Sequence, residues 1–129
     1  MTAPVNPKEA SLIVDELSAS FRRQAEAYRR LRSIVQKILG KLALSRGDVA
    51  GAMKLFAEKQ AVLDEISVEK KAHLLSCEVW QNSKEQIASM VSVERLNDAL
   101  DDVEKSIKDF LASEDQLGTY LSRFTGGNV

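Results

Sequence analysis

Leu44-Ser45-Arg46-Gly47-Asp48-Val49 separates two long runs of apolar residues and decides the fold of this chain. The run before it repeats in steps of three and four, with only Gln24 polar: Val14, Leu17, Phe21, Tyr28, Leu31, Val35, Ile38 and Leu42. The run after it begins with Ala52, Phe56, Leu63 and Ile66. Such spacing places one apolar stripe on a helix that packs along another helix. Gly47 suits the left-handed end of a helix and Asp48 can cap the next, so the stretch predicts a turn between two helices.

A third apolar run follows, with Glu114 as its polar interruption: Val93, Leu96, Leu100, Val103, Ile107, Phe110, Leu117, Leu121 and Phe124. The step from Val91 to Val93 breaks the alternation of three and four, as a turn between antiparallel helices does. We therefore expect a turn near Ser89 to Ser92, with Ser92 as the N-cap. Asn82-Ser83 is the alternative position, because Ser83 and Gln86 have the spacing of a capping box.

These patterns predict an all-α fold, an elongated antiparallel three-helix bundle with coiled-coil-like heptad packing. The expected helices cover residues 8–44, 49–89 and 92–124 of a single domain that spans 1–129, with short disordered termini. Several stripe positions in the middle of the second helix are polar, among them Lys59, Lys70 and His73. We expect this helix to be the least tightly packed.

Composition and charge fit a folded helical protein, with 44% hydrophobic and 29% charged residues and only two prolines. The formal net charge of −1 provides no general attraction to nucleic acid or to anionic membranes. Basic residues gather in the first helix, from Arg22 to Lys41, and acidic ones in the last, from Asp98 to Asp115. We expect these two helices to lie side by side and neutralise each other, and we expect no nucleic-acid partner.

The location indicated by the sequence is cytoplasmic. A lone cysteine, Cys77, excludes an intramolecular disulfide and suits a reducing compartment. Residues 1–7 lack the charged and apolar regions of a signal peptide. No apolar stretch approaches the roughly 20 residues that span a bilayer, so no membrane span is expected.

A search for chemistry in the sequence finds little. His73 and Cys77 are four residues apart and could offer zinc two ligands, but a stable site needs three or four. We interpret them as a buried histidine and a structural thiol on the packing stripe, and Trp80 as a core residue. Asp98, Asp101 and Asp102 are interpreted as a solvated face. We expect no catalytic residue, cofactor or metal, and no enzyme.

The end of the third expected helix carries more apolar residues than one stripe needs. They are Leu111, Leu117, Tyr120, Leu121 and Phe124. Contiguous apolar surface left exposed usually marks a partner site, so these residues are the candidate partner-binding set. The alternative is a terminal helix buried on more than one face.

The segment from Leu44 to Ile66 resembles the central segment of FlgN-type flagellar export chaperones. In that family a long helix ends near a Gly-Asp turn, and a Leu-rich helix follows with a lysine and then two apolar positions. The matching residues here are Gly47, Asp48, Leu55, Lys59, Leu63 and Ile66.

This resemblance implies a cytoplasmic chaperone of the flagellar type III export system. Such a chaperone holds the C-terminal segment of a hook–filament junction protein before export, as a helix in a groove. The family's binding region corresponds to the segment from Leu111 to Phe124. One alternative is a self-associating coiled-coil adaptor, whose open face is a homodimer seam. Another is a metal- or redox-sensing protein built on His73 and Cys77.

Overall fold

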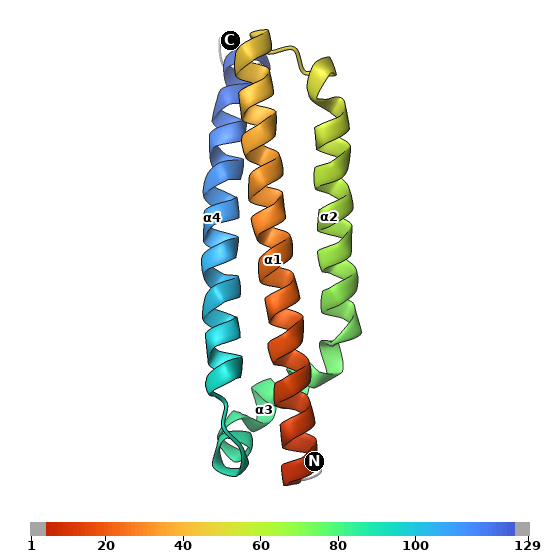
Figure 1. Ribbon diagram of the computed structural model, residues 1–129, viewed down its shortest axis with the longest axis vertical. Coiled ribbons are helices and arrows are strands. Elements are labelled where there is room, and N and C mark those ends of the chain that lie inside the picture. The colour runs from red at the N-terminus through yellow and green to blue at the C-terminus, as the bar shows by residue number, and fades with distance from the viewer. Residues whose placement is uncertain (1–4, 126–129) are drawn as a thin grey trace.

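The computed structural model describes residues 5–125, and over these residues the chain is all-α (Figure 1). Its elements are α1 (Pro7–Ser45), the short 3-10 helix η1 (Ala50–Ala52), α2 (Met53–Ala72), α3 (Leu74–Met90) and α4 (Glu94–Thr125). In Figure 1, α1 rises along the molecule, α2 returns, α3 crosses near the lower end, and α4 rises again beside α1. α1 contacts each of the other three α-helices and is therefore the central element.

The two ends of α1 have local causes. At its start the Asn6 side chain accepts a hydrogen bond from the Glu9 backbone N–H at 2.8 Å, and Pro7 stands where a missing N–H costs nothing. At its end Arg46 and Gly47 have positive φ values of 58° and 90°. The Gly47 N–H donates to the Leu42 carbonyl at 2.8 Å. α1 therefore ends at the expected break and runs through Gly40.

Asp48 does not cap the second helix, so that expectation is wrong. The residue before η1 is Val49, and neither η1 nor α2 has a side-chain cap hydrogen bond. The Asp48 N–H instead donates to Ser45 Oγ at 3.2 Å, which ties it back to the end of α1. The physical reason is that η1 lies between the turn and α2, so Asp48 is too far from the first turn of α2.

The segment expected as one helix over residues 49–89 is two helices, so the described part of the chain has four α-helices and not three. The break is at His73, whose φ and ψ are −115° and 17°. Two polar contacts to α1 flank this break, from Lys70 to the Tyr28 hydroxyl and from His73 to Glu16. α3 then leaves the line of α2 (Figure 1).

α3 and α4 are joined at residues 91–93, where the sequence places its second turn. Ser92 Oγ accepts a hydrogen bond from the Glu94 N–H at 3.5 Å. The alternative position at Asn82-Ser83 corresponds to a kink inside α3, since Ser83 has non-helical φ and ψ of −132° and 24°. The chain reverses only at the later position.

The N-terminal residues expected to be disordered include one that is buried. Val5 is 6% exposed, and its carbonyl accepts a hydrogen bond from Gln86 Nε2 at 3.4 Å. Packing against α3 therefore orders the chain before Pro7. Residues 1–4 and 126–129, also assigned to the termini, lie outside the described residues.

α1 and α4 pack in parallel with a constant register. Arg29 Nη1 donates to Ser106 Oγ at 3.3 Å, and Gln36 Nε2 donates to Ser113 Oγ at 3.2 Å, each across 77 residues. That offset is a whole number of heptads, as coiled-coil-like packing requires. The buried residues of α4 repeat every seven positions: Leu96, Val103, Phe110 and Leu117, with the small residues Ala99, Ser106 and Ser113 beside them.

The core is divided into two apolar clusters along the length of the molecule. One lies between α1, α2 and α4 and includes Leu31, Ile66 and Phe110. The other lies where α3 crosses and includes Leu17 and Trp80. The residues of α1 between them include three buried polar ones, Ser18, Ser20 and Gln24. Phe21 lies among these polar residues and packs against both clusters, so the polar residues interrupt the core of α1 without separating the two clusters.

The charge distribution differs in part from the expected neutralisation of the first helix by the last. Arg29 of α1 pairs with Asp102 of α4 at 3.0 Å, as expected. Arg23 and Arg30, however, pair with glutamates of α2. The basic face of α1 is wide enough to contact both neighbours, so the acidic face of α4 neutralises only part of it.

Two glycines give opposite predictions for stability. Gly47→Ala forces an L-residue to φ 90° and should lower the free energy of unfolding by about 1–2 kcal/mol. Gly40→Ala should raise it by about 0.5–1 kcal/mol, since Gly40 is inside α1 with nothing near an added Cβ. Urea unfolding followed by circular dichroism measures both. Equal effects would contradict the turn geometry.

The small residues between α1 and α4 predict a size limit. Ser106→Leu should destabilise the fold by about 1–3 kcal/mol, because Ser106 is 4% exposed and a larger side chain would push the helices apart. Ser106→Ala keeps the size and removes only the hydroxyl, so it should cost about 1 kcal/mol or less. If thermal unfolding shows the leucine variant to be as stable as the alanine variant, α1 and α4 do not approach each other closely at Ser106.

Candidate functional site

The candidate partner-binding residues of α4 do not gather on one exposed face. Leu117 is 2% exposed and belongs to the core. Tyr120 and Leu121 are half-buried against the same core, and the Tyr120 hydroxyl donates to the Leu42 carbonyl at 3.0 Å. Leu111 is 56% exposed. The side chain of Phe124 lies outside the described residues. Heptad packing against α1 therefore buries part of the apolar surface that the sequence predicted to be exposed on α4.

A pocket of about 380 Å³ nevertheless lies at this end of the molecule. It is formed by α1 and α4 and is lined by Leu39, Asp115, Gln116, Thr119, Tyr120 and Arg123. Leu111 precedes Asp115 by four residues, so it lies one turn away on the same side of α4. The open surface here therefore combines apolar side chains with both signs of charge.

The residues that carry the family resemblance build the contacts of α2. Gly47 forms the turn, Asp48 is exposed, and Leu55, Leu63 and Ile66 pack in or against the core. Lys59 of α2 forms an ion pair with Glu114 of α4, both less than a third exposed. This pair explains the polar interruption of the third apolar run, since Glu114 faces a lysine across the bundle.

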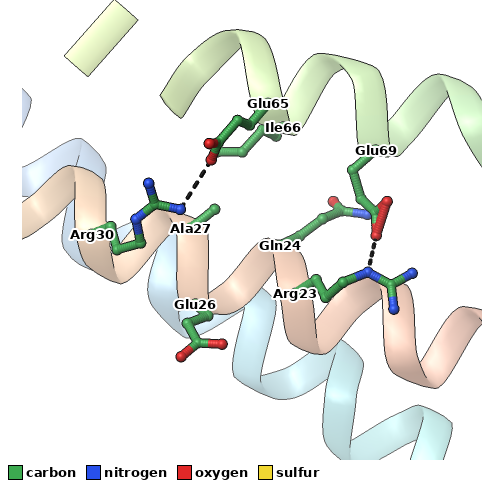
Figure 2. Close-up of a pocket in the computed structure, with 8 residues that line it drawn as sticks. All are labelled: Arg23, Gln24, Glu26, Ala27, Arg30, Glu65, Ile66 and Glu69. Carbon is green, nitrogen blue, oxygen red and sulfur yellow. Dashed lines mark hydrogen bonds and ion pairs between the residues drawn. The ribbon is translucent and has the colours of Figure 1, made fainter. Parts of the chain in front are cut away.

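A second hollow runs along the seam between α1 and α2, and sequence reasoning missed it (Figure 2). It consists of two adjoining pockets of about 450 and 370 Å³ that share Arg30 and Glu65. Buried apolar residues of both helices line it, including Ala27, Ile34 and Ile66. We call it the α1–α2 furrow.

The rims of the α1–α2 furrow carry opposite charge. Arg23, Arg30 and Lys37 stand seven residues apart on the α1 rim, and glutamates occupy the α2 rim. Arg30 pairs with Glu65 at 2.9 Å, and Arg23 pairs with Glu69; Figure 2 shows both pairs across the seam. The seven-residue repeat of the basic residues is the signal that could have found this arrangement, because such positions flank an interhelical seam.

His73 lies at the lower end of this seam, in a cluster of charged side chains and not in the apolar core. Its Nδ1 is 2.8 Å from Glu16 Oε2, and its Nε2 is 3.4 Å from Glu69 Oε2. Arg23 Nη2 is also 3.4 Å from Nε2. The expectation of a histidine buried on the packing stripe is therefore wrong, because the break after α2 turns the ring toward these partners.

The surroundings of His73 shift the pKa values of two neighbouring groups, Glu16 and Cys77, in opposite directions. Hydrogen bonds donated by His73, and next by Ser76, lower the pKa of Glu16 below its ordinary value. Partial burial, and then the negative charge of Glu16, raise the pKa of the Cys77 thiol. Cys77 is only partly buried. Glu16 is thus held as a carboxylate and Cys77 as a neutral thiol.

Trp80 is 8% exposed and packs in the apolar cluster at the α3 crossing, so its interpretation as a core residue is confirmed.

Within residues 5–125 no group of three or more histidine, cysteine, aspartate or glutamate side chains is arranged to hold a metal ion. None of the described helices is both long and apolar enough to cross a membrane.

Comparisons of this chain with protein-family models, with curated proteins and with solved structures find no match. Its function is therefore inferred from the described surface, which includes the pocket at the end of α1 and α4, the α1–α2 furrow and the charged cluster around His73.

The lowered pKa of Glu16 predicts how stability depends on pH. A carboxyl group whose pKa is lower in the folded than in the unfolded state stabilises the fold above its unfolded value, near pH 4.5, and loses that contribution as pH falls through the folded value. Glu16→Gln should therefore reduce stability at neutral pH, and the difference from wild type should shrink in acid. Urea unfolding across this range measures it. A difference that does not change with pH would contradict the hydrogen bonds to Glu16.

Proposed function

We propose that this protein is a chaperone-like protein of the FlgN flagellar export type, which binds a helical segment of a protein client. Its client would be the C-terminal segment of a hook–filament junction protein, held in the cytoplasm before type III export. Two observations support this proposal. The segment from Leu44 to Ile66 resembles that family, and the structure is an elongated helical bundle with open seams between its helices.

The pocket at the end of α1 and α4 is the observation that carries the proposal. Tyr120 lines it, Leu39 adds apolar surface from α1, and the exposed Leu111 extends the same side of α4. A helix that docks in a groove needs apolar anchors one turn apart and polar partners at the edges. Asp115 and Arg123 supply charge of both signs beside the apolar positions.

The bundle geometry leaves room for such a helix. α1 and α4 lie side by side, and residues of these two helices alone line the pocket. A client helix laid along this seam would stand where a further helix of a bundle stands. The client-binding region is therefore narrower than the sequence indicates, since the pocket and Leu111 remain available while Leu117 belongs to the core.

A second copy of the chain is the alternative occupant, as in a self-associating adaptor. The feature that favours it is exposed apolar surface near the break between α1 and α2. There Leu44 is 91% exposed, Met53 is 59% exposed and Val49 is 37% exposed. Sedimentation at low concentration distinguishes the two, because an adaptor should stay dimeric without a client, whereas a chaperone of this type should be largely monomeric or only weakly dimeric.

Leu111→Ser should weaken capture of C-terminal peptides of hook–filament junction proteins by about 1–2 kcal/mol, roughly a tenfold change in affinity, since it removes an exposed apolar anchor. Leu75→Ser is the matched control, because Leu75 is 77% exposed but lies at the start of α3, away from the pocket. Fluorescence anisotropy with labelled peptides measures both variants.

Two outcomes would count against the proposal. One is that the intact wild-type chain binds none of the junction-protein peptides. The other is that both serine variants lose affinity equally, which would mean that the client does not bind at the end of α4.

A further inference from the structure

We propose that His73, with Glu16, Arg23 and Glu69, forms a proton-dependent clamp that fixes the α2–α3 corner to α1. This inference goes beyond client binding and uses none of the residues assigned to it. His73 is the residue at which α2 stops and α3 starts, so any change in its side-chain contacts acts at the joint between two helices.

The positions of the four side chains make the contacts of the imidazole depend on its charge. A neutral ring that donates from Nδ1 to Glu16 presents a lone pair at Nε2. That lone pair can accept from Arg23 Nη2, 3.4 Å away. A protonated ring carries N–H groups on both sides. Its Nε2 then donates toward Glu69 Oε2, also 3.4 Å away, and repels Arg23. The proton thus turns the contact with Glu16 of α1 into an ion pair and exchanges Arg23 for Glu69 at Nε2, so Glu16 holds the corner on α1 and Glu69 holds the ring in place.

The formal charge of the cluster changes with the charge of the ring. Glu16 and Glu69 contribute two negative charges, and Arg23 contributes one positive charge. The cluster is therefore negative by one unit with a neutral ring and balanced with a protonated one. The His73 side chain is only 19% exposed, which limits screening of these charges by water. Histidine is the side chain that ordinarily changes charge between about pH 5 and 8.

Neighbouring titratable groups do not take over this role. On α2, Lys70 is directed to the Tyr28 hydroxyl at 3.2 Å. On α3, the raised pKa of Cys77 keeps its thiol neutral at this pH. On the α1 side, Asp15 is paired with Arg95 of α4 at 3.7 Å. Among the described contacts, no charged group of α4 reaches the ring.

The clamp lies in a weakly packed part of the structure. It stands beside the stretch of α1 that lies between the two apolar clusters, where Ser18 Oγ is buried without a hydrogen-bond partner among the described residues. Of the twenty residues of α2, only Val62 and Ile66 are fully buried. The start of α3 is also exposed, with Leu74 at 56% and Leu75 at 77%. Loss of the His73 contacts should therefore loosen the corner without unfolding α1 or α4.

Hydrogen exchange of the wild-type chain at about pH 6 and about pH 8, corrected for intrinsic rates, tests the clamp directly. Amides in the first turns of α3 should be about three- to fivefold better protected at the lower pH, as a partly exposed ion pair allows. The chain has a single histidine and a single tryptophan, so the ring signals of His73 and the fluorescence of Trp80 should change over the same pH interval.

Two variants and one control isolate the cause. His73→Gln should abolish the pH response of α3, and Glu69→Gln should reduce it strongly by removing the carboxylate that the protonated ring gains at Nε2. Glu65→Gln is the matched control, because it removes the same charge from the neighbouring ion pair with Arg30 and leaves His73 untouched. It should respond to pH as the wild type does.

The proposal is overturned if His73→Gln keeps the pH response, or if the two glutamine variants of α2 behave alike. If His73→Gln fails to fold, the comparison of Glu69→Gln with Glu65→Gln remains decisive, since both of these variants keep the histidine. Peptide binding measured on the same samples separates this result from the proposed function, because the clamp can fail while client affinity is unchanged.

Discussion

The parallel packing of α4 on α1 is the constraint on which the rest of the structure depends. Both helices carry apolar and small residues at intervals of seven, and two contacts between them, one heptad apart, keep the same offset of 77 residues. Ser106 and Ser113 let the helices approach closely and satisfy their own hydroxyls on the carbonyls of Asp102 and Asp109. Because the two helices are parallel, the chain between them must return along the length of the molecule. Residues 46–93 make that return as α2 and α3.

α2 and α3, which form the return segment, are stabilised by different interactions from those between α1 and α4. α2 has few fully buried residues and is tied to its neighbours by ion pairs, such as Arg30 with Glu65 and Lys59 with Glu114. An ion pair as exposed as that of Arg30 with Glu65 contributes little free energy, typically about 0–1 kcal/mol. The least stable part of the bundle is therefore expected along α2 and at its joint with α3. The proton-dependent clamp proposed at His73 acts at this joint, while the proposed client site lies on the more stable pair of helices.

Much of the fold could be predicted from the sequence because heptad spacing and glycine report local geometry. The break at Gly47 and the turn before α4 follow from a positive φ and from a change of phase. The division of the second expected helix could not be predicted in this way. No glycine or proline marks His73, and the Glu16 side chain that it contacts at the break is 57 residues away in the chain. For the same reason the charged rims of the α1–α2 furrow were missed.

The sequence by itself determined that the described chain is helical, where its apolar stripes lie and that α1 ends just before Gly47, because these depend on spacing and backbone preference within one segment. Only the tertiary structure decided which apolar residues remain exposed. Leu117 is buried and Leu111 is not, although both stand on α4, because α1 covers one side of that helix. The tertiary structure alone also brings His73 between two glutamates and an arginine, since three helices must meet before these charges can interact.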